Sequence, residues 1–223
     1  MYFSRVTLKL DVLPYVMQQK MQYAGQYAIH QWLWQLFPNQ EKRTFLFREE
    51  QTKKSRQYYL LSQVVPVTTH PLFFVETKPY SPQLTSGIKL IFSLRANPVI
   101  FKNGKRSDVM TNARLLAKQQ GLSSVEMNIL QNKAALNWLT KQGEKKGFSL
   151  IKNAEQQLSC NILGFYQHQF NKRKKLNPIT YTSVDFKGIL TVTDPHLFLD
   201  TLHQGIGKSK GFGCGLFLIK RYQ

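Results

Sequence analysis

The chain has 223 residues, of which 31 are lysine or arginine and 12 are aspartate or glutamate. Its length suits one large domain or two small ones, and a hydrophobic content of 42% is enough to build a core. The net charge of +19 favours a polyanionic partner, nucleic acid ahead of an anionic membrane, and no run of 18 apolar residues occurs, so we expect a cytoplasmic protein without a membrane span.

The first half of the chain alternates strand-like and helix-like segments. Residues 2–10 alternate apolar and polar side chains, which predicts a half-buried strand. A helix is predicted over residues 22–37, ended by Pro38. Further strands are predicted over residues 44–48, 57–63, 73–77 and 88–99. This order is close to the ferredoxin-like β-α-β-β-α-β pattern with its second helix reduced.

The second half repeats this order of elements. A helix is predicted over residues 126–145, because apolar residues recur there at helical spacing. Asp194 followed by Pro195 predicts the start of another helix, since these residues favour the N-cap and the first helical position, and this helix runs to about Gln204. Strands are predicted over residues 148–151, 160–165, 184–192 and 215–220.

Together these elements predict an α+β fold of two tandem ferredoxin-like, or RRM-like, domains, with antiparallel sheets and helices packed on one face of each. The N-terminal domain is predicted at residues 1–101 and the C-terminal domain at residues 112–223, joined by a basic link at residues 102–111. The order of elements supports this division, and no repeat of individual residues does.

The first predicted helix carries a candidate for proton transfer. At about 100° per residue, its apolar residues fall on one face, which we predict to be the core face: Ile29, Trp32, Leu33 and Leu36. His30 lies off that face and shares another arc with Tyr27 and Trp34. Imidazole exchanges protons near neutral pH, so His30 and Tyr27 are candidate catalytic residues. A packing role for His30 stays open at this point.

The remaining polar residues argue against a metal or cofactor site. The twelve acidic residues scatter, and the adjacent Glu49 and Glu50 would point to opposite sides of a strand, whereas a two-metal nuclease needs converging carboxylates. Cys160 and Cys214 form no zinc-like cluster and are predicted to be reduced core thiols. The other histidines are predicted to be surface or capping residues: His70, His168, His196 and His203.

Several glycines surround Lys208 and Lys210 near the C-terminus. Glycine lets a backbone approach another backbone closely and leaves its N–H groups accessible, while lysine supplies charge for phosphate oxygens. We predict a clamp on an RNA backbone formed by Gly207, Lys208, Ser209, Lys210, Gly211 and Gly213. A glycine-rich turn between a helix and the last strand is the alternative, and the pattern alone favours neither.

Two basic runs are predicted to bind RNA phosphates. The first contains Lys172, Arg173, Lys174 and Lys175, and it is predicted to lie at the tip of a hairpin that grips an RNA stem. The second contains Lys102, Lys105 and Arg106, in the predicted link. A solvated face is the alternative for the first run. The more scattered basic residues are interpreted as solvation only: Lys42, Arg43, Lys53, Lys54 and Arg56.

Short motifs extend over almost the whole chain: Met1-Tyr2-Phe3-Ser4, Tyr27-Ala28-Ile29-His30, Phe92-Ser93-Leu94-Arg95-Ala96-Asn97-Pro98, Gln204-Gly205-Ile206-Gly207 and Gly211-Phe212-Gly213-Cys214-Gly215-Leu216. Each motif alone has modest specificity, but their order is highly specific. In this order they resemble the CasE family, the CRISPR repeat-processing endoribonucleases of the type I-E Cascade complex.

The resemblance implies a tandem ferredoxin-like fold, binding of a CRISPR repeat RNA hairpin and metal-independent cleavage on its 3′ side. Carried over by position, His30 is the catalytic histidine and Tyr27 its active-site partner, with no cofactor. The hairpin with Lys172 to Lys175 takes the place of the family's stem-gripping element, although its sequence matches no fixed motif. The mature guide RNA is expected to stay bound. The protein is expected to be monomeric when free and to join the other Cascade subunits.

The chemistry needs no metal, because the RNA 2′-hydroxyl can attack the adjacent phosphate and leave a 2′,3′-cyclic phosphate and a 5′-hydroxyl. His30 serves in this scheme as the base on that hydroxyl or as the acid on the leaving oxygen, and the sequence leaves both roles open. The alternative function is a non-catalytic subunit that binds an RNA hairpin in a ribonucleoprotein, with Tyr27 and His30 as packing or stacking residues.

Overall fold

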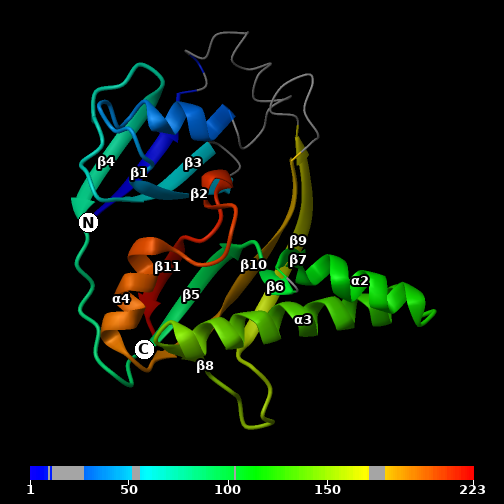
Figure 1. Cartoon of the computed structure of the whole chain (residues 1–223). Helices are drawn as coiled ribbons and strands as arrows, with labels where there is room; N and C mark the ends of the chain where they lie inside the picture. The colour runs from blue at the N-terminus through cyan, green and yellow to red at the C-terminus, as the bar shows by residue number, and fades with distance from the viewer. Residues whose placement is uncertain (10, 12–27, 52–55, 103, 171–178) are drawn as a thin grey trace.

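The computed structural model describes residues 1–9, 11, 28–51, 56–102, 104–170 and 179–223. The described residues form two large antiparallel sheets and a separate two-stranded one, with the large N-terminal sheet above the large C-terminal sheet in Figure 1. Helical residues 28–34 cover one face of the first sheet, and the remaining helices lie with the second. Among the residues that the structure describes, no helix is both long and apolar enough to cross a membrane.

The first sheet has the strand order β2-β3-β1-β4, with antiparallel pairs throughout. Its strands are β1 (Tyr2–Leu8), β2 (Phe45–Gln51), β3 (Arg56–Ser62) and β4 (Phe73–Pro79). Alternation decides which face is buried, so that Ser4, Val6 and Leu8 of β1 point inward. The order is that of a ferredoxin-like unit, and residues 63–72 between β3 and β4 contain no helix, as predicted.

The second sheet has the order β11-β5-β10-β8, and β9 pairs with β10 on the same edge as β8. Its strands are β5 (Lys89–Ala96), β8 (Phe148–Leu150), β9 (Cys160–Phe170), β10 (Ile179–Val192) and β11 (Phe217–Arg221). The helices are α2 (Val109–Gln119), α3 (Ser124–Lys145) and α4 (Pro195–Gln204). Helices α3 and α4 pack on one face of this sheet, and α2 packs along α3 (Figure 1). The prediction of two ferredoxin-like units is confirmed.

The assignment of residues 88–99 to the first sheet is wrong. They form β5, which lies inside the second sheet between β10 and β11, with Arg95 opposite Asp185. Strand β4 completes the first sheet instead, so the chain changes sheets within residues 80–88. The predicted link at residues 102–111 instead belongs to a hairpin, β6 (Val99–Lys102) and β7 (Lys105–Asp108), that leads into α2.

Side-chain caps define where the helices begin. Asp108 starts α2, a helix that the sequence analysis missed, and its Oδ1 accepts the backbone N–H of Met110 at 2.9 Å. Ser123 and Glu126 form a capping box at the start of α3. Asp194 accepts the backbone N–H of Leu197 at 3.0 Å, which confirms the predicted start of α4.

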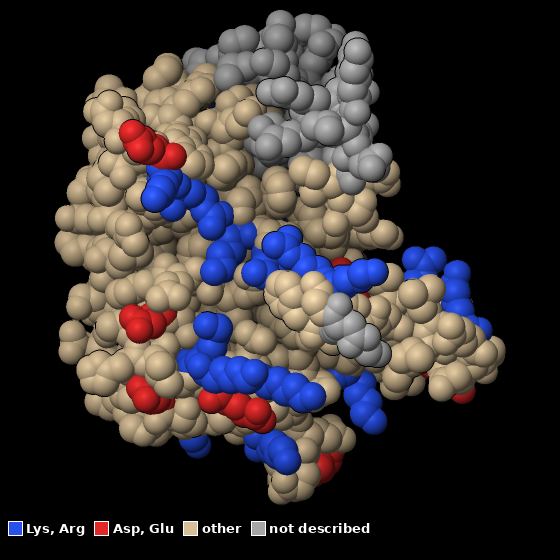
Figure 2. Space-filling view, viewed as in Figure 1, with Lys and Arg blue, Asp and Glu red and all other residues tan. Residues whose placement is uncertain are grey.

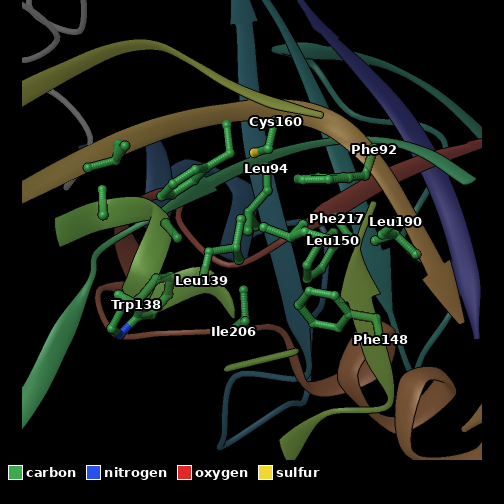
Figure 3. Packing of buried hydrophobic residues seen from close by; sticks show 14 of the residues in the cluster. Phe92, Leu94, Trp138, Leu139, Phe148, Leu150, Cys160, Leu190, Ile206 and Phe217 are labelled. Carbon is green, nitrogen blue, oxygen red and sulfur yellow. The ribbon is translucent and has the colours of Figure 1, made fainter. Parts of the chain in front are cut away.

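The main core fills the space between the second sheet and its helices (Figure 3). Leu94 and Phe186 of the sheet and Leu139 of α3 are completely buried there. Burying one such side chain contributes about 1.5–3 kcal/mol to folding. Cys160 and Cys214 are buried free thiols, as predicted, and burial raises the pKa of each to about 12.

A smaller apolar cluster joins the two sheets. Leu46 of β2 and Leu61 of β3 pack against Leu216, just before β11, and all three are buried. A methyl group at Gly205 would lie 2.8 Å from Leu46 Cδ1, so the backbone after α4 lies directly against the first sheet. This contact fixes the C-terminal end of the chain beside the N-terminal sheet.

Candidate functional site

The helix over residues 28–34 places His30 at the border of the first core. Ile29 and Leu33 are buried on the sheet side, which confirms the predicted core face. The His30 ring is half-buried, in edge contact with Trp34 at 5.4 Å between centroids, and stacked near Phe47 at 6.1 Å. These rings hold the imidazole in one orientation.

The surroundings keep His30 in its neutral form. Burial, followed by the positive charge of Arg43, lowers the pKa of His30 to about 4. Its Nε2 atom is buried and forms no hydrogen bond with any described residue. At neutral pH this imidazole is therefore uncharged, with Nε2 unpaired among the described residues. Tyr27, its predicted partner, lies outside the described residues.

The Gly-rich segment, residues 205–215, is held near both ends by the end of strand β5. The backbone N–H of Gly215 donates to the carbonyl of Arg95 at 2.7 Å. Nearer the start, the N–H of Lys208 donates to the carbonyl of Asn97 at 3.4 Å. These bonds join the Phe92-to-Pro98 motif to the glycine run in the fold.

A short 3₁₀-helix, η1 (Lys210–Phe212), forms the tip of the Gly-rich segment. The residue before it is fixed by a hydrogen bond from Asn97 Nδ2 to Ser209 Oγ at 2.7 Å. From this position η1 reaches across to the edge strand β2 of the first sheet, beneath the helix that carries His30 (Figure 1). The second unit thus delivers a backbone turn to the first unit's histidine.

Gly211 is the point at which the two units meet around His30. A methyl group on Gly211 would lie 3.6 Å from Arg43 Nη1 and 3.9 Å from His30 Nε2. The Arg43 side chain, the His30 ring and the η1 backbone therefore border one small space. This juxtaposition is the candidate site.

The glycines of the segment serve different purposes. Gly207 has a φ of 75°, and a methyl group there would lie 2.9 Å from the Asn97 carbonyl oxygen, so the fold itself needs glycine. Gly213 has a φ of 80°. Gly211 has no such constraint, because a methyl group there would make only ordinary contacts with Arg43 and His30. A side chain at Gly211 would occupy the candidate site rather than strain the backbone.

Stacked rings support the underside of η1. Phe212 stacks on Tyr181 of β10 at 5.3 Å, and Tyr181 stacks on His168 of β9 at 4.5 Å. The His168 ring is in turn fixed by a hydrogen bond to Ser183 Oγ at 2.7 Å. His168, predicted as a surface or capping residue, is thus a half-buried packing residue.

Positive charge accumulates at the candidate site. Lys210 is half-buried, and its pKa is lowered by burial and then by the charges of Arg43, Lys146 and Lys208. Burial also lowers the pKa of Arg43, so its interpretation as a solvated surface residue is wrong. Figure 2 shows Lys and Arg side chains in a band across the middle of this face. Such a concentration of cations favours an anionic ligand.

The predicted second basic loop lies beside the Gly-rich segment. Lys208 Nζ sits over the Phe101 ring of β6, 5.5 Å from its centroid. In the adjoining strand β7, Lys105 and Arg106 are exposed, and Lys102 ends β6. The Gly-rich segment and the second basic loop, two of the three predicted RNA-binding segments, therefore lie on one side of the molecule.

The third predicted segment, Lys172 to Lys175, lies outside the described residues. The strands on either side of it, β9 and β10, pair as a hairpin with Phe170 opposite Ile179. Its contact with RNA stays a prediction.

An open groove of about 700 Å³ begins at His30 and follows the outer side of its helix. Its lining combines aromatic rings and side-chain amides: Trp34, Phe37, Gln31, Gln35, Asn39 and Gln40. Phe37 is buried, but a half-buried ring such as Trp34 can stack on an unpaired base, and side-chain amides can hydrogen-bond to base edges. Among the described residues, no group of three or more His, Cys, Asp or Glu side chains is arranged to hold a metal ion.

Comparison with known proteins places this site in context. A family model described as "CRISPR associated protein" matches residues 1–221. The chain is 29% identical over 197 residues to the CRISPR system Cascade subunit CasE of Escherichia coli K12, covering 86% of this chain and 90% of that protein. It is 31% identical over 150 residues to the CRISPR-associated endoribonuclease Cse3 of Thermus thermophilus, covering 64% of this chain and 60% of that protein.

The fold is also similar to a solved structure, that of CRISPR endoribonuclease Cse3 bound to a 19-nucleotide RNA. The TM-score is 0.77 at 22% identity, over 99% of this chain and 100% of the other. This match supports the tandem ferredoxin-like architecture.

Proposed function

The chain belongs to the CasE family of CRISPR-associated proteins, and from this membership we propose that it is a metal-independent endoribonuclease that cleaves CRISPR repeat RNA. Its relatives include a protein named as an endoribonuclease and one named as a Cascade subunit. The substrate is a repeat hairpin, and the cut falls on its 3′ side. The excess of 31 basic over 12 acidic residues suits such a polyanion.

The observation that carries the proposal is the neutral, unpartnered Nε2 of His30 beside the Gly-rich segment. A methyl group on Gly211 would lie 3.9 Å from that nitrogen, so an RNA backbone lying along η1 comes within reach of it. Because the pKa of His30 is about 4, the ring is unprotonated at pH 7 and available to act as a base. A buried ring nitrogen in a purely structural role is usually hydrogen-bonded, whereas this one is unpaired among the described residues.

In the proposed mechanism, His30 Nε2 accepts the proton of the 2′-hydroxyl as that oxygen attacks the adjacent phosphorus in line. The bond from phosphorus to the 5′-oxygen breaks, and that oxygen takes up a proton. The products are a 2′,3′-cyclic phosphate and a 5′-hydroxyl. Tyr27 orients a reacting oxygen or supplies the second proton. General acid–base catalysis contributes about 10²–10⁴-fold to such a reaction.

Positioning supplies much of the remaining acceleration. Attack in line requires the nucleotide 5′ to the scissile phosphate to be unstacked and turned, and the groove beside His30 offers rings and amides that could hold it. The Gly-rich segment and the β6–β7 hairpin hold the backbone. We further propose that the cleaved guide RNA stays bound, so that each molecule turns over once, and that the RNA-bound protein joins the other Cascade subunits.

Mixing purified protein with 5′-labelled repeat RNA in excess EDTA tests this function. We expect one discrete cut at the 3′ base of the hairpin and no cut in an unrelated hairpin of equal length. His30→Ala run in parallel excludes a contaminating nuclease. Recovery of tightly bound but intact repeat RNA would instead support the alternative function, a non-catalytic hairpin-binding subunit.

A further inference from the structure

We propose that the Arg43 guanidinium binds the scissile phosphate and stabilises the negative charge that develops on it during cleavage. This inference rests on the proposed endoribonuclease function and deepens it by naming a further catalytic residue. Arg43 stands just before strand β2, outside every motif that identified the family.

The geometry places Arg43 and His30 next to one point. The position of a methyl group on Gly211 lies within 4 Å of both Arg43 Nη1 and His30 Nε2. An RNA strand that approaches the η1 backbone therefore meets both groups at once. If His30 removes the proton from the 2′-hydroxyl, the phosphate attacked by that oxygen lies next in the strand and within reach of Arg43.

Arg43 also differs from the other described arginines that are buried or half-buried, because no carboxylate of the described residues pairs with it. Arg48 lies 2.8 Å from Glu50, Arg95 lies 2.8 Å from Asp185, and Arg56 lies 3.8 Å from Glu49. No described carboxylate forms an ion pair with Arg43, and burial is the cause of its lowered pKa. Its described charged neighbours in the site are cationic.

A buried arginine stays charged at neutral pH, so it cannot avoid the free-energy cost of burying its charge by losing a proton. A desolvated cation without a counterion is unfavourable, and binding an anion offsets that penalty. Half-buried Lys210 is also an unfavourably placed cation, because its pKa is lowered by burial and by the charges of three further cations. The free protein thus holds a preformed site for one negatively charged group, next to the catalytic histidine.

The chemistry of the guanidinium suits the phosphate of the transition state. Its planar donors can form two parallel hydrogen bonds to the nonbridging oxygens, a pairing that an ammonium group cannot reproduce. These oxygens gain charge as the fifth bond to phosphorus forms, so the interaction strengthens during the reaction. Removing one such donor from an active site typically costs about 10²–10³-fold in rate.

Single-turnover cleavage by Arg43→Gln, with Lys42→Gln as the matched control, tests the proposal. Lys42 is exposed and adjacent, so the control makes the same charge change without touching the site. We expect Arg43→Gln to cleave about 10²-fold more slowly at saturating protein, with about tenfold weaker affinity for an uncleavable hairpin. Arg43→Lys should recover only part of the rate. A folded Arg43→Gln protein that cleaves within about threefold of wild type would overturn the proposal.

A second measurement locates the contact and does not depend on turnover. The probe is a repeat hairpin with a 2′-deoxy nucleotide before the scissile bond, made with a normal or a neutral methylphosphonate linkage at that bond. Wild type should bind the neutral linkage about tenfold more weakly, and Arg43→Gln should bind both RNAs nearly equally. An equal penalty in both proteins would show that Arg43 contacts some other group.

The two proposals fail in different ways. Wild-type protein that binds the hairpin but never cuts it would refute the endoribonuclease function. Wild-type protein that cuts, together with a fully active Arg43→Gln variant, would refute the role of Arg43 alone.

Discussion

The neutral state of His30 is a property of its position, not of its sequence neighbours. Aromatic rings from its own helix and from β2 bury it, and the Arg43 charge further lowers its pKa to about 4. Helical periodicity was enough to predict that His30 lies off the core face. It could not predict the neutral state, because Arg43 is adjacent only after β2 has paired with β3.

The sequence analysis did not identify Arg43 as a candidate site residue, for a related reason. Next to Lys42 it has the sequence signature of a solvated pair, whereas the fold brings it beside η1, from the far end of the chain, and burial lowers its pKa. That no described carboxylate pairs with it is a signal that the sequence alone does not carry. A candidate site residue that is recognised by its surroundings in the fold can be identified only from the structure.

Replacing His30 with alanine should abolish cleavage and leave hairpin affinity within a few-fold of wild type, because the ring moves protons and contributes little binding surface. Single-turnover kinetics with labelled repeat RNA measures the first effect, and filter binding measures the second. His196→Ala, at an exposed position on α4, is the matched control. A folded His30→Ala protein with near-normal cleavage would eliminate His30 as the catalyst.

The lowered pKa of His30 also predicts how stability depends on pH. As the pH falls below the ordinary value of 6.5, the unfolded chain takes up a proton at His30, but the folded protein does so only near pH 4. Wild type should therefore lose stability relative to His30→Gln as the pH is lowered from 7 to 4.5. Urea unfolding of both proteins at several pH values measures this difference. A constant difference would mean that the folded protein does not depress the pKa of His30.

At the scale of elements, two glycines of the Gly-rich segment should respond differently to alanine. Gly207→Ala should cost about 1–3 kcal/mol of stability, because its φ is 75° and its methyl group would lie 2.9 Å from the Asn97 carbonyl. Gly211→Ala should unfold near the wild-type temperature but cleave at least about tenfold more slowly, because its methyl group fills the space beside Arg43 and His30. Thermal melting and single-turnover kinetics separate the two effects. Normal cleavage by Gly211→Ala would show that RNA does not enter this space.

The basic run between β9 and β10 should govern the salt dependence of binding. Changing Lys172, Arg173, Lys174 and Lys175 to glutamine should weaken hairpin binding and reduce the log–log salt slope by about 0.7–0.9 for each lost phosphate contact. The control removes the same charge from exposed residues elsewhere: Arg114, Lys118, Lys133 and Lys152. Fluorescence anisotropy at several salt concentrations gives both slopes. Equal slopes for the two variants would mean that only net charge matters.

Local sequence signals predicted most helices and strands, but they did not predict which strands pair with each other. Alternation predicted β1, and Asp194 with Pro195 predicted α4, because these features act within a few residues. Strand β5 was assigned to the wrong sheet, since its pairing with β10 and β11 depends on residues that are distant in sequence. Helix α2 did leave a usable signal, the Asp108 cap followed by buried residues at helical spacing: Val109, Met110, Ala113 and Ala117.

At the scale of the whole molecule, the site exists because two similar units contribute different parts. The first unit supplies the histidine and Arg43, and the second supplies a backbone turn that β5 and β10 hold in place. The Leu46–Leu61–Leu216 cluster fixes the distance between them. Neither unit alone contains the candidate site, which explains why element order predicted the fold but not the site's composition.

The central claim is that the RNA supplies its own nucleophile and that His30 accepts its proton. The most direct measurement compares repeat RNA with a substrate that is 2′-deoxy only at the nucleotide 5′ to the scissile phosphate, in excess EDTA. We predict that both bind equally, that the all-ribose RNA is cut to a 2′,3′-cyclic phosphate, and that the 2′-deoxy RNA stays intact. Cleavage of the 2′-deoxy RNA, or a product with a 5′-phosphate that forms only with a divalent ion, would show that water is the nucleophile and would contradict the mechanism.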